Sequence, residues 1–120
     1  MLYFGLDGDS IGRIIESYLI ENNVEELEQF SKKIVKAIEE IKTLVETMDG
    51  KVIFCTGDSI LFYGEIDPSF GEVIVRIFKE KTNRTASVGI GKTTAFTYLG
   101  LKLAKSKGGN QVVYYNEKTL

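Results

Sequence analysis

Histidine is absent from this chain of 120 residues, and cysteine occurs once, at Cys55. Without histidine there can be no Ser-His or Cys-His nucleophile pair and no histidine-ligated metal. One cysteine can form neither an internal disulfide nor a cysteine-rich zinc site. Any catalysis must therefore depend on carboxylates, lysine, hydroxyl groups or a bound metal.

The chain also lacks an excess of basic residues and a long apolar run. Its 15 Lys and Arg stand against 17 Asp and Glu, for a net charge of −2. A general nucleic-acid binder needs a basic face, so we expect no stable nucleic-acid binding, whereas a nucleotide needs only one or two local cations. No segment approaches the roughly 20 apolar residues of a membrane span, and the first residues lack a signal-peptide pattern. We expect a cytoplasmic protein without membrane insertion.

A hydrophobic content of 43% predicts one globular domain spanning residues 1–120. The apolar periodicity predicts the element order β-α-α-β-β-α-β-α-β. A split β-α-β unit with a central hairpin is the ferredoxin-like palm arrangement. We therefore expect an α+β fold with an antiparallel-rich, five-stranded sheet and helices covering one face. The predicted strands are 2–6, 51–56, 59–63, 84–90 and 111–115, and the predicted helices begin at Asp9 or Ser10, at Val24, near Pro68 and at Thr93.

The apolar pattern also predicts which side chains are buried. Cys55 alternates with apolar neighbours, so we expect it in the core. In the first helix, helical spacing places Leu19 on the inner face with Ile11, Ile14, Ile15 and Tyr18. In the last helix, it gathers apolar residues on one face, which we expect to pack inward: Ala95, Tyr98, Leu99, Leu103 and Ala104.

Two aspartates are candidates for the chemistry that the composition allows. Asp7 ends the first predicted strand, and Asp58 lies at the tip of the predicted hairpin. These strands are neighbours in a palm, so the two carboxylates should converge at one edge of the sheet. Mg²⁺ and Mn²⁺ require hard oxygen ligands that leave positions open for triphosphate oxygens. Alone, Asp7 could cap a helix and Asp58 could form a turn; together they predict a metal site, to which Gly8 could add its carbonyl.

Other residues near Asp7 have competing interpretations. We expect Asp9 to cap the first helix rather than to bind metal. The turn formed by Gly8, Gly12 and the helix start could hold phosphates through its backbone N–H groups, although such turns are common. Lys105 by itself has the pattern of a solvated helical lysine. Ser87 is expected to serve the end of its strand rather than the chemistry.

Four segments, in this order and spacing, resemble a known group of enzymes. The resemblance is to GGDEF diguanylate cyclases and to the polymerase palm of the large subunit of type III CRISPR complexes, in particular its stand-alone form, the minimal CRISPR polymerase. It covers essentially the whole chain. The segments are FGLDGDSIG (4–12), FCTGDSILF (54–62), SVGIG (87–91) and LKLAKSKGGN (101–110).

The resemblance implies roles for individual residues. Asp7 matches the first metal-binding aspartate, and Asp58 matches the first acidic residue of the GGDEF or GGDD signature. Lys105 matches the lysine of the AKxxG segment that contacts the triphosphate. The nucleotide-binding set implied in this way is Gly8, Asp9, Ser10, Ile11, Gly12, Ile15, Thr56, Gly57, Ser59 and Lys105.

The chain departs from the family pattern at five positions. Ser59 replaces the second acidic residue of the signature, and Thr56 replaces its first glycine. Ile15 stands where diguanylate cyclases have the asparagine that reads guanine. Phe54 and Gly109 replace basic residues. Adenine is therefore the expected base, and ATP the preferred triphosphate.

The implied activity is that of a nucleotidyltransferase. By resemblance, two metal ions (Mg²⁺ or Mn²⁺) assist synthesis of a cyclic oligonucleotide, expected to be a cyclic adenylate. We expect a homodimer, because one palm has a single pair of metal-binding carboxylates and room for one triphosphate. The family further implies anti-phage signalling through a separate, membrane-bound effector. One alternative is a catalytically degenerate palm that binds nucleotide or dimerises. Another is a receiver domain phosphorylated on Asp58, disfavoured because a predicted strand follows Asp58 directly.

Overall fold

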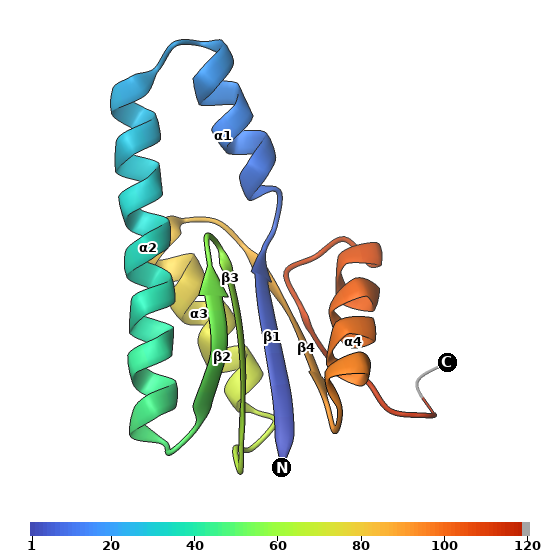
Figure 1. Cartoon of the computed structure of the whole chain (residues 1–120). Coiled ribbons are helices and arrows are strands. Elements are labelled where there is room, and N and C mark those ends of the chain that lie inside the picture. Colours follow the sequence, from blue (N-terminus) through green and yellow to red (C-terminus); the bar gives the residue numbers. More distant parts are fainter. Residues whose placement is uncertain (119–120) are drawn as a thin grey trace.

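The computed structural model describes residues 1–118 of the chain and has the predicted order of helices and strands (Figure 1). Most boundaries lie within three residues of the predicted ones. The elements are β1 (Leu2–Gly8), α1 (Ile11–Ile20), α2 (Val24–Thr47), β2 (Lys51–Thr56), β3 (Ser59–Gly64), α3 (Phe70–Thr82), β4 (Ala86–Gly91), α4 (Thr94–Ser106) and β5 (Val112–Tyr114).

The five strands form one sheet in the order β2-β3-β1-β4-β5. Strand β1 lies at its centre and pairs antiparallel with β3 and with β4, while β5 runs parallel to β4. The expected α+β palm with an antiparallel-rich sheet is confirmed. Because Asp58 belongs to the hairpin tip and β3 follows it directly, the arrangement of a receiver domain is contradicted.

Helices cover both faces of the sheet, so the expectation of one covered face was wrong. Helices α2 and α3 lie on the face that carries Phe4 and Phe62, whose stacked rings are 5.0 Å apart and meet Phe70 edge-on. Helix α4 packs on the opposite face, mainly over β4. Neighbouring strand residues point to opposite faces, so the central strands bury a side chain on each.

The inward face of α4 also differs from the prediction. Tyr98 and Leu99 are 59% and 42% exposed, and Ala95 is exposed too. The reason is Gly89 of β4, where an added Cβ would lie 2.2 Å from the carbonyl oxygen of Thr97. Helix and strand approach so closely that only small residues fit between them. The buried positions of α4 are Thr97, Gly100 and Ala104.

Strand β2 is the edge of the sheet, and its position corrects the prediction for Cys55. Apart from the partly buried Val52, its residues are exposed, Cys55 included. Its pairing with β3 is irregular between Val52 and Phe54, as at a β-bulge. An edge strand with an irregular register need not bury alternate side chains, so apolar alternation was misleading here.

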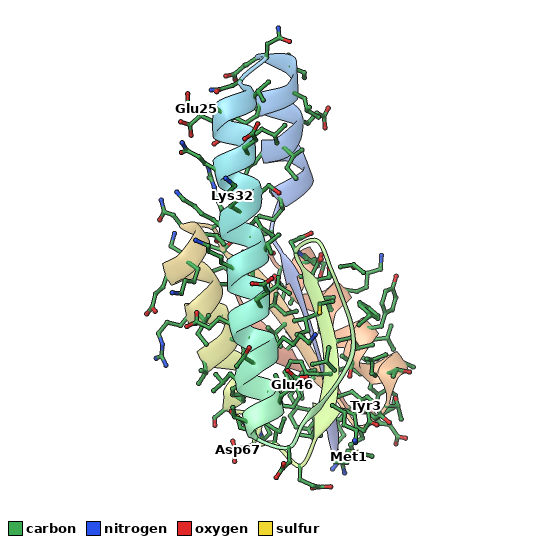
Figure 2. The ribbon with its side chains drawn as sticks, turned by 60° about the vertical axis from the view of Figure 1, so that its left-hand side comes forward. Met1, Tyr3, Glu25, Lys32, Glu46 and Asp67 are labelled. Atoms are coloured by element: carbon green, nitrogen blue, oxygen red, sulfur yellow. The ribbon has the colours of Figure 1, made fainter. Side chains whose placement is uncertain are left out.

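Helices α1 and α2 form a hairpin that extends beyond the sheet, as Figures 1 and 2 show. Tyr18 and Phe30 join the two helices edge to face at 5.9 Å. Leu19, predicted to face inward, is 59% exposed. The outer side of α2 carries charged residues such as Lys32. Within residues 1–118, no helix has both the length and the apolar character that crossing a membrane requires.

Candidate functional site

Asp7 and Asp58 meet at the end of the central strand. Asp7 lies opposite Ser59 of β3 on one side and Ser87 of β4 on the other. The hairpin tip turns at Gly57, whose φ of 54° lies in the left-handed region that favours glycine. The backbone N–H of Gly8 donates a hydrogen bond of 3.2 Å to the carbonyl oxygen of Asp58. The hairpin tip is thereby tied to the end of β1.

The Asp58 carboxyl group lies in a confined place beside Gly8. A Cβ added to Gly8 would lie 2.9 Å from Asp58 Oδ2, so the missing side chain makes room for this carboxylate. Burial raises the pKa of Asp58, and the negative charge of Asp7 raises it further. The ammonium group of Lys105 and backbone hydrogen bonds lower it by less. A cation bound at this end of the central strand would reduce the repulsion between the two carboxylates.

Asp7 is held by two side chains. Its Oδ1 accepts a short hydrogen bond from the Ser59 hydroxyl, and its Oδ2 is 3.3 Å from Lys105 Nζ. Ser59 occupies the position of the second acidic residue of the signature. The structure shows that its hydroxyl group orients Asp7 instead of adding a third negative charge.

Lys105, in the last turn of α4, reaches the end of β1. Its Nζ donates to the carbonyl oxygens of Gly8 at 2.8 Å and Asp7 at 3.2 Å, and to Asp9 Oδ1 at 2.9 Å. It is therefore not the solvated lysine that its helical position alone would indicate. The Gly8 carbonyl, considered above as a metal ligand, accepts from Lys105 in this arrangement.

Asp9 does not cap α1, contrary to the prediction. The N-cap residue is Ser10, in a left-handed conformation, and it makes no side-chain capping bond. The Asp9 carboxylate instead accepts hydrogen bonds from four groups. These are Thr85 Oγ1 (2.7 Å), Ser87 Oγ (2.8 Å), Lys105 Nζ (2.9 Å) and the Asn110 backbone N–H (2.8 Å).

The Asp9 cluster, defined as Asp9 with these four partners, joins β1, β4, α4 and the α4–β5 loop. Burial by itself would raise the pKa of Asp9, but the hydrogen bonds, with that of Lys105 first, together lower it. Thr85 and Asn110 were not predicted from the sequence, and Ser87 was expected to serve its strand end. One signal was present: Ser87 stands among buried apolar residues of β4, and a buried hydroxyl group requires a partner.

The remaining predicted nucleotide-binding residues lie around the start of α1 and the hairpin tip. Ile11 is 4% exposed and belongs to the hydrophobic core, and Ile15 packs against that core. Their side chains therefore contribute to packing. At Gly12 an added Cβ would meet nothing within 4 Å, so the first turn of α1 is open to an approaching ligand. Thr56 and Gly57 are exposed at the hairpin tip.

The donor groups can be compared with what a divalent cation requires. Within residues 1–118 there is no cluster of three or more His, Cys, Asp or Glu side chains suited to a metal ion. The carboxylate oxygens of Asp9 already accept hydrogen bonds from Lys105 and the three other members of its cluster. Asp7 has one partner on each carboxylate oxygen and keeps acceptor sites free, and Asp58 lies beside it. Mg²⁺ is commonly bound by one or two carboxylates together with substrate phosphate oxygens and water. The residues present fit such an ion.

The sheet topology and the paired aspartates define a palm of the nucleotidyl cyclase and polymerase type. The model of the minimal CRISPR polymerase domain matches residues 3–115, and the chain belongs to this family. A similar solved structure is the GGDEF domain of DgcB from Caulobacter crescentus in complex with c-di-GMP. It has a TM-score of 0.60 and 12% identity, and the match covers 93% of this chain and 75% of that one. A likeness at this identity establishes the fold. A sequence search of curated proteins finds no significant match.

Proposed function

We propose that the protein is a nucleotidyl cyclase that makes a cyclic adenylate from ATP in the presence of Mg²⁺ or Mn²⁺. The observation that carries this proposal is the convergence of Asp7 and Asp58 at the end of β1, where burial and then the negative charge of Asp7 raise the pKa of Asp58. Membership of the minimal CRISPR polymerase family supports it.

In the proposed reaction, a 2′- or 3′-hydroxyl oxygen of one nucleotide forms a bond to the α-phosphorus of another. The bond from that phosphorus to the bridging oxygen breaks, pyrophosphate leaves, and the hydroxyl proton passes to solvent. Asp7 and Asp58 would hold the divalent metal ions, which would neutralise charge on the leaving group and activate the attacking hydroxyl group. Ser59 orients Asp7, and Asp9 orients Lys105.

The triphosphate would lie against the open first turn of α1. Backbone N–H groups at a helix N-terminus attract phosphate oxygens, and neither a side-chain cap nor a side chain at position 12 obstructs them here. The Lys105 ammonium group lies 3.3 Å from Asp7 Oδ2. A β- or γ-phosphate bound beside Asp7 would therefore be within its reach. The preference for ATP is supported by Ile15, an apolar residue packed on the core that offers guanine no hydrogen bond.

We further propose a homodimer in which two such sites face each other, because one carboxylate pair serves one triphosphate. The product would act as a signal in anti-phage defence, received by a separate, membrane-bound effector. A second candidate function is a palm that binds nucleotide without turning it over. It is favoured by Ser59, which leaves the site one carboxylate short of the family signature.

The experiment that tests the proposal is incubation of the pure protein with ATP, GTP, CTP or UTP and either Mg²⁺ or Mn²⁺. Mass spectrometry identifies the products. A cyclic adenylate that forms from ATP alone and disappears with EDTA supports the cyclase. Binding of ATP with no product under any condition supports the second candidate. Faster conversion of GTP would contradict the expected base preference.

A further inference from the structure

A cavity of about 530 Å³ opens beside Asp7 on the face of the sheet that α4 covers. It exists because α4 packs mainly over β4, β1 and β5, leaving the β2–β3 hairpin side of this face open. Gly5 helps to keep it deep: a Cβ there would come within 3.2 Å of the Thr97 side chain and 3.7 Å of the Leu61 side chain. One end of the cavity is formed by Asp7, Thr56 and Ser59.

The other part of the cavity is apolar and aromatic. Phe54 of β2 and Tyr98 of α4 contribute from different elements, and Leu61 and Leu101 also line the cavity. Phe54 is 46% exposed and Tyr98 is 59% exposed. Small-molecule sites are typically concave, of a few hundred Å³, with apolar walls and a few polar groups. Aromatic side chains bind nucleobases by stacking, whatever the base.

From this juxtaposition of an aromatic cavity and Asp7, we propose that the cavity binds the adenine ring of one of the two ATP molecules. The inference rests on the proposed function and specifies it further. The ribose and phosphates would extend from the cavity toward Asp7 and the hairpin tip. Ile15 of α1 would then only leave guanine without a hydrogen bond, while adenine is bound on the α4 side of the sheet.

The polar groups of the lining are few, so stacking would contribute most of the affinity for the base. Of the residues that line the cavity, all in the described part of the chain, Asp7 carries the only charge, and it is engaged by Ser59 and Lys105. The Thr97 hydroxyl group already donates to the carbonyl oxygen of Tyr3. The hydroxyl groups of Thr56 and Thr94 can each donate or accept a hydrogen bond. The preference for adenine is therefore taken from the proposed function, and stacking on Phe54 and Tyr98 would hold the ring.

The test uses Phe54→Ala and Tyr98→Ala in the full chain. Affinity for a non-hydrolysable ATP analogue with Mg²⁺ is measured by calorimetry, beside the KM for ATP. Loss of a stacking partner should weaken binding about fivefold to a hundredfold. Ile53→Ala and Leu99→Ala are matched controls, because these neighbours are 47% and 42% exposed and do not line the cavity. Their affinities should match that of the wild type.

The outcomes separate this inference from the proposed function. Normal affinity and KM in both cavity variants would overturn the adenine site while leaving the cyclase intact. Wild-type protein that binds the analogue through Phe54 and Tyr98 but forms no product would support the site and overturn the cyclase. No binding by wild-type protein would overturn both. Sedimentation at the same analogue concentration completes the test: weaker binding that arises only from dissociation of a dimer would make the cavity an interface and overturn the assignment.

Discussion

The ionised carboxylate of Asp58 is less favourable in the folded protein than in the unfolded chain, because burial and the charge of Asp7 raise its pKa. Its raised pKa means that the folded, metal-free protein holds this proton more tightly than the unfolded chain does. The contribution of Asp58 to stability is therefore fully present in acid and is lost as the pH rises through the raised pKa. Binding of a divalent cation, as proposed, would offset this unfavourable charge and would give the buried carboxylate a function.

The first prediction concerns Asp58→Asn. In EDTA, this variant should gain stability relative to the wild type as the pH rises from 3 to 7, because Asn carries no charge to bury. Urea unfolding followed by circular dichroism measures the difference. A difference in the free energy of unfolding that does not change with pH would contradict the prediction. With Mg²⁺ added, the melting temperature of the wild type should rise and that of the variant should not.

The second prediction is that Asp7→Asn and Asp58→Asn each abolish product formation from ATP while the protein stays folded. Each change leaves a single carboxylate for the divalent cation. Product is measured by mass spectrometry, and folding by circular dichroism. Glu46→Gln, an exposed change on α2, serves as the control (Figure 2). Substantial turnover by either aspartate variant would remove that residue from the proposed metal site.

Asp9 behaves in the opposite way from Asp58, and the third prediction concerns its replacement by Asn. Because its folded-state pKa is lowered, its stabilising contribution is present above the unfolded pKa and is lost as the pH falls through the folded value. Asp9→Asn should lower the free energy of unfolding at pH 7 by about 2 kcal/mol, as expected for charge-assisted hydrogen bonds. Urea titrations should show this loss shrinking toward zero in acid; an equal loss at pH 7 and pH 2 would count against it.

At the scale of elements, the close contact between α4 and β4 determines where Lys105 lies. Lys105 is in the last turn of α4, and the helix is held against the sheet by Thr97, Gly100 and Ala104. The backbone of the helix contacts Gly89 so closely that no side chain fits at this position of the strand. Gly89 therefore serves the site indirectly, through the position of the helix.

The fourth prediction tests this contact. In Gly89→Ala, the new methyl group would lie 2.2 Å from the Thr97 carbonyl oxygen and 2.3 Å from the Leu101 backbone nitrogen. Overpacking against backbone should cost about 3 kcal/mol or more. Gly12→Ala is the matched control: its Cβ meets nothing within 4 Å, and alanine in a helix should stabilise by up to about 1 kcal/mol. Chemical denaturation measures both, and a Gly89→Ala protein as stable as the wild type would refute the close packing.

At the scale of the whole molecule, one chain presents one pair of candidate metal ligands, while ring closure requires two nucleotides. An isologous dimer provides two sites from one surface. The fifth prediction is that specific activity falls on dilution as the dimer dissociates. Sedimentation with a non-hydrolysable ATP analogue and Mg²⁺ gives the dissociation constant for comparison. Activity per molecule that remains constant where the protein is wholly monomeric would exclude the dimer as the active form.

The order of the elements could be predicted from the sequence because apolar periodicity is a local property. The same holds for the hairpin around Gly57 and Asp58. The pairing of Asp7 with the hairpin required one further step, that a palm places these strands side by side, and the register of β1 with β3 confirms it.

Only the tertiary structure decided which faces are covered and which polar groups meet. The buried face of α4 consists of small residues, which hydropathy does not distinguish, and Tyr98 is exposed as a result. The Asp9 cluster gathers residues separated by up to 101 positions in the chain, and no local pattern encodes such a meeting. Periodicity reports which residues avoid water. It does not report how closely two backbones approach, and that distance places Lys105 beside Asp7 and shapes the cavity next to it.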